Sequence, residues 1–115
     1  MLSHRYRFHG HRSLRYLYQH GERYQTKTLT LRYSKNSHRV HSRYAIIISK
    51  KVLKSAVKRN RLRRRIYEVI RTHQDDLPKG YDVAISIFSS ELLELPHAEL
   101  TKQLDQLFRQ SGLVK

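Results

Sequence analysis

The chain has 115 residues, and 24 lysines and arginines against nine acidic residues give it a formal net charge of +15. This length allows one domain, and so large a charge on so small a body favours a polyanionic partner. Hydrophobic residues make up 38% of the chain, with only four glycines and two prolines. That composition is typical of a folded basic domain and excludes a disordered basic tail.

The sequence also excludes several classes of site. It contains no cysteine, so disulfides, thiolate metal sites and cysteine nucleophiles are ruled out. No apolar run approaches the roughly 20 residues that cross a bilayer, and no signal-peptide core follows Met1. We therefore expect a cytoplasmic protein with no membrane partner.

The first third of the chain predicts an arm, a short helix and the start of a sheet. Residues 1–10 are polar and basic and predict an extended arm. Apolar side chains recur at helical spacing within residues 11–20, and Gly21 is a natural C-terminal stop. Residues 27–34 alternate apolar and polar side chains, which indicates a half-buried strand. There is room for one more short strand at residues 23–25.

The remaining elements alternate between strand and helix. An Ala-Ile-Ile-Ile run within residues 43–49 predicts a central strand covered on both faces. A helix is expected from a Ser55 N-cap to about Thr72, and a second buried strand at residues 81–88. Pro96 opens a last helix that ends near residue 112. The order α-β-β-β-α-β-α predicts a single α+β sandwich over residues 1–115.

Charge is distributed unevenly along the sequence. Residues 1–74 hold 20 of the 24 basic residues and only two acids, Glu22 and Glu68, whereas residues 75–115 hold seven acids against four basic residues. Seven of the eight tyrosines also lie in the first 74 residues. Basic residues interleaved with aromatic rings suit RNA, where phosphates need cations and unstacked bases need flat partners.

The helix from Ser55 carries most of this charge. Its apolar stripe is expected to consist of Leu62, Ile66, Val69 and Ile70, with Val57 about one turn earlier. Residues 58–65 place six arginines and lysines in about two turns, where like charges four residues apart destabilise an isolated helix. Such a helix is expected to meet phosphate, which guanidinium groups bind with two parallel hydrogen bonds.

The segment from residue 43 to residue 71 resembles the signature region of the bacterial ribonuclease P protein subunit. In that family a strand ends in Ser-Lys-Lys, and a short link leads to a helix that opens with Arg-Asn-Arg. The matching residues here are Ser49, Lys50, Lys51, Arg59, Asn60 and Arg61, followed by the basic positions Arg63 and Arg64. The helix at residues 11–20 and the last strand and helix also resemble the family. Tyr67 stands where arginine is usual, so it is not assigned an RNA contact.

The resemblance implies an accessory subunit of an endoribonuclease whose RNA subunit is the catalyst and removes the 5′ leader of precursor tRNA with Mg²⁺, held through the RNA. No protein side chain is then catalytic, and neither a protein metal site nor DNA binding is expected. The residues implied to contact the catalytic RNA are Lys50, Lys51, Arg59, Asn60, Arg61, Arg63 and Arg64. Those implied to line a cleft for the leader are Phe8, Arg12, Tyr18 and Ser49. The implied fold is a four-stranded sheet with a left-handed β-α-β crossover, and the protein is expected to be a monomer in a 1:1 complex with RNA.

Two other classes of function stay open from the residues alone. The eight histidines could serve a self-sufficient nuclease. Five of them lie in presumed arm or loop segments and form no recognisable pair with a carboxylate: His4, His9, His11, His38 and His41. A small ribosomal or other structural RNA-binding protein would have a similar composition. Only the combination of Ser-Lys-Lys with Arg-Asn-Arg favours the ribonuclease P interpretation.

Overall fold

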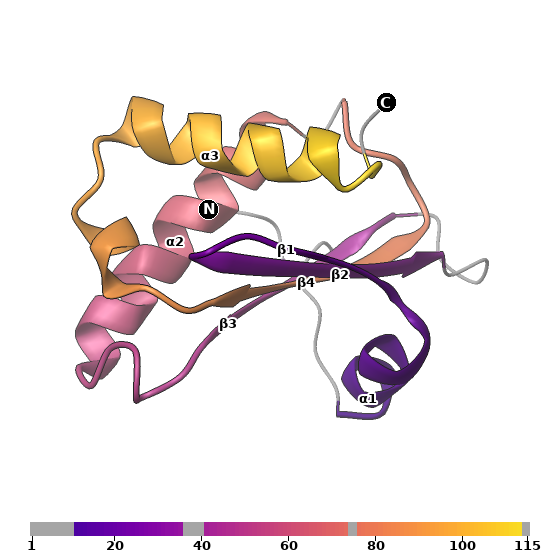
Figure 1. Ribbon diagram of the computed structural model, residues 1–115, viewed down its shortest axis with the longest axis horizontal. Helices are drawn as coiled ribbons and strands as arrows, with labels where there is room; N and C mark the ends of the chain where they lie inside the picture. The colour runs from indigo at the N-terminus through magenta and orange to yellow at the C-terminus, as the bar shows by residue number, and fades with distance from the viewer. Residues whose placement is uncertain (1–10, 36–40, 74–75, 114–115) are drawn as a thin grey trace.

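A four-stranded sheet with one helix on one face and two on the other forms the molecule (Figure 1). The computed structural model describes residues 11–35, 41–73 and 76–113, so the expected arm at residues 1–10 lies outside the described residues. In chain order the elements are α1 (His11–His20), β1 (Glu22–Gln25), β2 (Leu29–Lys35), β3 (Arg43–Ile48), α2 (Ala56–Thr72), β4 (Tyr81–Ile87), the short 3-10 helix η2 (Ser90–Leu93) and α3 (His97–Gln110). The predicted order is confirmed, and η2 is an addition that the sequence did not indicate.

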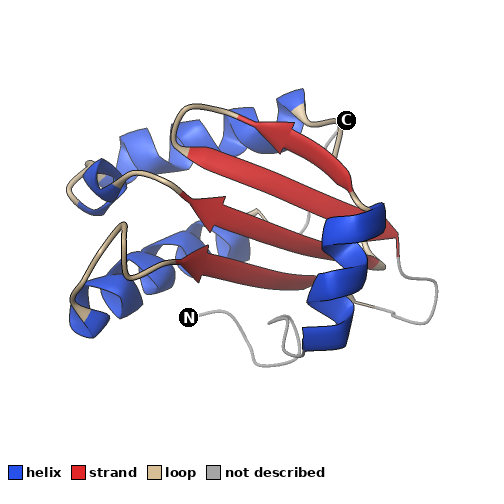
Figure 2. Ribbon diagram, turned by 60° about the horizontal axis from the view of Figure 1, so that its bottom comes forward, coloured by secondary structure: helices blue, strands red, loops and turns tan. Residues whose placement is uncertain are grey.

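The strand order across the sheet is β1-β2-β4-β3. Strand β2 pairs antiparallel with both β1 and β4, whereas β3 and β4 are parallel and are joined through α2. In Figure 2 both parallel strands run toward the left, with β3 below β4 and α2 behind the sheet. The β3-α2-β4 crossover is therefore left-handed, as the resemblance implied, against the usual right-handed rule.

The main core lies between the sheet and the helices α2 and α3. Cross-strand partners Leu31, Ile85 and Ile46 form one apolar row on this face. The predicted stripe of α2 packs on the sheet through the buried side chains Leu62, Ile66, Val69 and Ile70. The inclusion of Val57 in that stripe was wrong, because Val57 is 77% exposed. Five residues before Leu62, it is about 140° away around the helix axis.

The opposite face of the sheet is covered in its middle by α1. Leu17 of this helix is buried against Ala45 and Ala84, whose short side chains let the helix approach the strands. The end of α1 at Gly21 is confirmed, and a Cβ there would lie 2.6 Å from the Leu17 carbonyl oxygen. Glycine is needed at this position because the chain turns against the helix that it has just left.

Helix α2 begins as predicted. The Ser55 Oγ accepts a hydrogen bond from the Lys58 backbone N–H at 3.3 Å, which satisfies one of the free donors of the first turn. Strand β3 is less enclosed than predicted, since Ile47 is only half-buried on the α1 face while its neighbours Ile46 and Ile48 are buried. The α1 face of the sheet therefore keeps accessible surface beside the helix.

Candidate nucleic-acid interface

The solvent-facing side of α2 and the loop before it carry a group of exposed cations. Arg61 and Arg64 lie three residues apart on one side of the helix, and Lys58 is three residues before Arg61. Within the described residues these three side chains make no hydrogen bond or ion pair. The same holds for the exposed lysines of the loop between β3 and α2. We call the whole set the outer basic surface: Lys50, Lys51, Lys54, Lys58, Arg61 and Arg64.

A second side of α2 faces the outer edge of β3, and its polar groups bind main-chain carbonyls. Arg59 Nη1 donates to the carbonyl oxygens of Leu53 and Lys54 at 2.8 and 2.9 Å. Arg63 Nε donates to the Ile46 carbonyl oxygen at 3.3 Å. Arg63 Nη1 also donates to Asn60 Oδ1 at 2.8 Å, so Asn60 orients its neighbour. These contacts hold the predicted residues Arg59, Asn60 and Arg63 within the protein's own hydrogen-bond network.

The third polar side of α2 faces η2. Arg65 Nη1 donates to the carbonyl oxygens of Leu92 and Leu93 at 3.3 and 2.6 Å, and its Nη2 donates to the Leu95 carbonyl. This guanidinium satisfies carbonyls at the end of η2 that the short helix cannot pair itself. Arg65 is half-buried and has a structural role, although it belongs to the same run of basic residues.

Near the C-terminal end of α2, Glu68 forms an ion pair with Arg71. Arg71 Nε donates to Glu68 Oε1 at 2.9 Å. This hydrogen bond, with the positive charge behind it, lowers the pKa of the Glu68 carboxyl well below its ordinary value. The Glu68 carboxylate therefore keeps its charge to lower pH than an ordinary glutamate, and it neutralises one charge of the helix beyond the outer basic surface.

On the α1 face of the sheet, arginine and aromatic side chains lie together. The guanidinium of Arg32 lies over the Tyr18 ring, 4.5 Å from its centroid. Arg23 is the direct cross-strand partner of Arg32 in the β1–β2 register, so two like charges stand side by side on one face. Such a pairing is destabilising unless an anion is bound nearby. Because the family resemblance implies a leader contact for Tyr18, we call Tyr18, Arg23 and Arg32 the leader-face cluster.

Two of the four predicted leader residues lie where the structure describes their side chains. Tyr18 is 45% exposed on α1 and belongs to the cluster. Ser49 is exposed directly after β3. Because Ile48 pairs with Ile87, Ser49 lies at the same end of the sheet as Phe88. For Arg12 the structure describes only the backbone, within α1, and Phe8 lies outside the described residues.

Tyr67 is buried, and its hydroxyl donates to the Tyr44 carbonyl oxygen at 3.4 Å. Its exclusion as an RNA contact is consistent with this position. Phe88 is the opposite case, because it is 52% exposed on the α1 face although its sequence context marked it as the end of a buried strand. Sequence reasoning also missed Arg23 and Arg32. The available signal was the alternation of β2, which places Arg32 opposite the apolar face.

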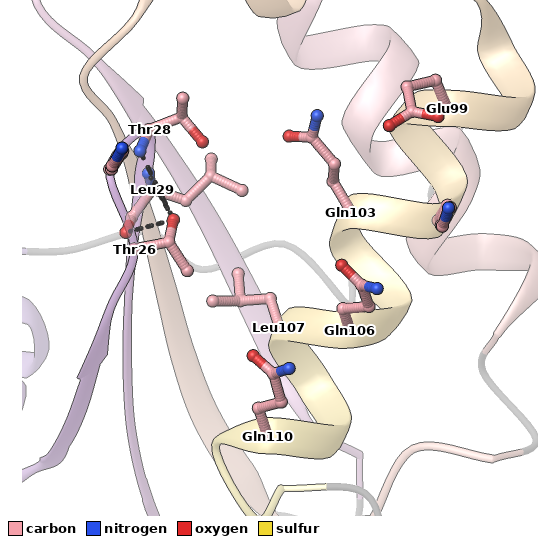
Figure 3. Close-up of a pocket in the computed structure, with 10 residues that line it drawn as sticks. Thr26, Thr28, Leu29, Glu99, Gln103, Gln106, Leu107 and Gln110 are labelled. Atoms are coloured by element: carbon pink, nitrogen blue, oxygen red, sulfur yellow. Dashed lines mark hydrogen bonds between the residues drawn. The ribbon is translucent and has the colours of Figure 1, made fainter.

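The molecule also has a polar pocket of about 400 Å³ between α3 and the β1–β2 turn (Figure 3). Gln103, Gln106 and Gln110 of α3 face Thr26 and Leu29 across it, and Gln110 Oε1 accepts a hydrogen bond from the Tyr24 hydroxyl at 2.7 Å. Glu99 is the one carboxylate among the lining residues and has no histidine beside it there. Lys27 and Lys102 also line it, so the pocket is a weakly basic polar groove and holds no acid–base pair of a carboxylate and a histidine.

Two further features are absent from the described ranges. No helix among them is long and apolar enough to span a membrane. They also contain no group of three or more histidine or acidic side chains that could hold a metal ion.

Exposed cations without a partner in the described part of the chain, on α2 and the loop before it, and an arginine–tyrosine cluster on a neighbouring face are typical of basic RNA-binding α+β domains. Residues 2–112 match the family model described as Ribonuclease P. The chain belongs to the family of ribonuclease P protein components.

Curated relatives and solved structures agree with this assignment. The ribonuclease P protein component of Synechocystis sp. is 35% identical over 98 residues, which cover 85% of this chain and 78% of the relative. That of a Synechococcus strain is 33% identical over 117 residues, with coverage of 99% and 87%. The Thermotoga maritima RNase P protein has a TM-score of 0.78 at 25% identity over 90% of this chain and 96% of its own. The Staphylococcus aureus protein, at 19% identity, shares the fold with a TM-score of 0.84 over 96% of this chain and 98% of its own.

Proposed function

We propose that the outer basic surface binds the catalytic RNA of ribonuclease P and that the leader-face cluster binds the single-stranded 5′ leader of precursor tRNA. A ribonuclease P protein component is the accessory subunit of a tRNA-processing endoribonuclease, and catalysis resides in its RNA. The side chains of this chain therefore have to bind and position RNA and do not have to break a bond.

The observation that carries the first half of the proposal is the set of exposed cations with no partner among the described residues. Lys50, Lys51, Arg61 and Arg64 belong both to this set and to the residues assigned from the family resemblance. Neighbouring like charges weaken the isolated helix by a few tenths of a kcal/mol per pair. A phosphate backbone removes this repulsion and gains charge-assisted hydrogen bonds from the guanidinium groups. Arg59, Asn60 and Arg63, the remaining assigned residues, adjoin the surface from the side of β3.

Substitution of the two outward arginines tests this surface. Arg61→Ala combined with Arg64→Ala is expected to lower the affinity for the catalytic RNA at least tenfold in 150 mM salt, because two phosphates lose their partners. The slope of log affinity against log salt should become less steep by about 1.5 if each arginine neutralises one phosphate. Arg109→Ala is the matched control, since Arg109 pairs with Asp105 on α3. Equal affinity and slope for the double variant and this control would refute the assignment.

The second half of the proposal is supported by the chemistry of the leader-face cluster. A flexible single strand offers phosphates to Arg23 and Arg32 and unstacked bases to the exposed rings of Tyr18 and Phe88. Stacking is sequence-tolerant because every base has a π-face. A subunit that serves many precursor tRNAs needs this tolerance. Phe8, Arg12 and Ser49 are proposed as further leader contacts on the basis of the family resemblance.

Binding of the leader by this cluster can be tested by comparing two substrates, precursor tRNA and mature tRNA, in the reconstituted holoenzyme. Wild type is expected to favour a precursor tRNA with a leader of several nucleotides over mature tRNA. Tyr18→Ala should reduce that preference about tenfold, in line with the 1–3 kcal/mol per base measured for aromatic stacking in other proteins. Tyr16→Ala is the control, because Tyr16 is also exposed on α1, at 58% against 45% for Tyr18, but contacts the His20 ring. An unchanged preference in Tyr18→Ala would rule out stacking at this ring.

We further propose that one copy of the protein binds one RNA and that Mg²⁺ acts through the RNA subunit. This is supported by the surroundings of the described acidic side chains, since arginine binds three of the eight and no three histidine or acidic side chains of the described ranges form a group that could hold a metal ion. Arg71 binds Glu68, Arg109 binds Asp105 and Arg43 binds Asp82. Native mass spectrometry of the protein–RNA complex would test the stoichiometry. Cleavage of precursor tRNA by the protein alone, without the RNA subunit, would contradict the assignment of catalysis to the RNA.

A further inference from the structure

Three residues of α2 at a spacing of four form a continuous seam with strand β3 and the loop that follows it. Arg59 binds the Leu53 and Lys54 carbonyls, Arg63 binds the Ile46 carbonyl and Tyr67 binds the Tyr44 carbonyl. Because β3 is the last strand of the sheet, its outer carbonyls have no neighbouring strand to pair with. The seam satisfies them from the helix, and its arginine end reaches beyond the strand into the lysine-rich loop.

That loop, residues 49–55, carries half of the outer basic surface. Lys50, Lys51 and Lys54 are exposed on it, and mutual repulsion of three like charges favours an open, spread-out conformation. Opposing this, the Val52 and Leu53 backbone N–H groups donate to the Ser49 carbonyl at 3.1 and 3.2 Å, and the Leu53 side chain is buried in the core. Two attachments therefore hold the start and the middle of the loop.

The third attachment is Arg59. One of its nitrogens, Nη1, holds two successive carbonyls at the end of the loop, where the chain enters α2. One turn later Arg63 holds a carbonyl of β3, ahead of the loop, so the two guanidinium groups bracket the lysines from both sides. Arg59 Nη1 cannot leave these carbonyls for a phosphate without breaking both hydrogen bonds at the end of the loop.

Building on the proposed function, we infer that Arg59, with Arg63 and Asn60 behind it, is a positioning residue that holds Lys50, Lys51 and Lys54 in the geometry that binds RNA. Direct phosphate contact falls to the outward residues, which adds Lys54 and Lys58 to those assigned from the family resemblance. The Arg-Asn-Arg motif thus combines two tasks. Its second arginine, Arg61, contacts the RNA, and its first shapes the neighbouring contact surface.

A double-mutant cycle separates positioning from direct contact. The variant Lys50→Ala/Lys51→Ala/Lys54→Ala removes the charges that Arg59 is inferred to position. Arg59→Ala is expected to weaken binding of the catalytic RNA three- to tenfold in the wild-type background and less than twofold in this triple variant. Arg61→Ala is the matched control and should cost the same factor in both backgrounds. An equal loss for Arg59→Ala in both backgrounds would mean that Arg59 contacts its own phosphate, and the inference would be wrong.

A measurement on the free protein gives an independent readout that needs no RNA. Arg59→Ala should speed hydrogen exchange at the Val52 and Leu53 amides at least tenfold, while Arg61→Ala leaves both rates unchanged. Unchanged exchange in Arg59→Ala would overturn the inference whatever the RNA affinity. Failure of the proposed function is distinguishable, because the triple lysine variant would then bind the catalytic RNA as tightly as wild type.

Discussion

The two faces of the sheet differ in chemistry although the same four strands build them. Toward α2 and α3, the row Leu31, Ile85 and Ile46 is apolar and at most 5% exposed. One residue along β2, on the α1 face, Arg32 lies between Arg23 and Ala84 in the same kind of cross-strand row. The period of two in strand side chains thus separates the surface that stabilises the fold from a surface that is free to bind.

The packing of α1 explains how this face of the sheet can hold a helix and also expose arginine side chains. Helix α1 needs only a small apolar footprint, the pair Ala45 and Ala84 under Leu17, with Leu14 and Ile47 packed beside them. The remaining width of the face is left to polar and aromatic groups. On the other face, two helices cover the sheet and leave no such room. This difference predicts that substitutions at neighbouring positions of one strand act on different properties, the free energy of unfolding on one face and RNA binding on the other.

The largest effect is expected at the buried ion pair on the α1 face. Arg43 Nε and Nη2 donate to the two Asp82 carboxylate oxygens at 3.0 and 3.1 Å, and both side chains are about nine-tenths buried. Asp82→Ala leaves a buried guanidinium without its carboxylate and should lower the free energy of unfolding by about 3–5 kcal/mol. Urea denaturation measures this loss. The double variant Arg43→Met/Asp82→Leu should recover most of it, and failure to do so would show that the charges themselves are needed.

The second largest effect should come from the apolar face. Leu31 is fully buried, so Leu31→Ala removes packed side-chain volume and is expected to cost about 2–5 kcal/mol. Since no RNA contact is proposed on this face, the folded fraction should bind the catalytic RNA within twofold of wild type. Urea denaturation and RNA titration below the unfolding transition give the two values. A large loss of RNA affinity in the folded protein would contradict the prediction that this face affects stability and not RNA binding.

Much of the fold could be predicted from the sequence because each signal was local. The alternation in β2, the isoleucine run in β3, the Ser55 cap and the Gly21 stop all act within a few residues of the element that they define. The short helix η2 gave no periodic pattern at four residues and was missed. Val57 was misplaced because its apolar side chain was taken for core, although helix geometry points it to solvent.

The candidate site was predictable only in part. Its basic residues are adjacent in the sequence, but their orientation depends on elements that are distant in the sequence. The run of residues 58–65 identified α2 as the basic helix, but seven of its eight side chains are polar and look alike in sequence. Which of them turn inward depends on β3 being an edge strand beside α2 and on η2 lying across from it. The pairing of Arg23 with Arg32 likewise depends on a β1–β2 register that four residues of β1 could not specify.

A smaller effect, on binding, is expected at Arg32. Arg32→Ala removes one cation from the leader-face cluster and uncovers one side of the Tyr18 ring. The affinity of the holoenzyme for precursor tRNA should fall several-fold, and its salt slope should become less steep by about 0.7, the value for one phosphate of a single strand. Affinity for mature tRNA, which lacks the leader, should not change. A loss that is equal for both substrates would place Arg32 in contact with another part of the RNA.

The smallest effect, opposite in sign, is expected at Thr30, the residue adjacent to Leu31 on the other face. Thr30 is buried, and its Oγ1 has no hydrogen-bond partner among the described residues. A buried hydroxyl without a partner costs about 1–3 kcal/mol of desolvation. Thr30→Val keeps the shape and removes the hydroxyl, so it should raise the free energy of unfolding by about 1 kcal/mol in urea denaturation. The matched variant Thr30→Ala should be destabilising because it leaves a cavity. If Thr30→Val instead lowered stability, the hydroxyl would have to be bound in the folded protein, and the α1 face would hold a polar contact that contributes to the fold itself.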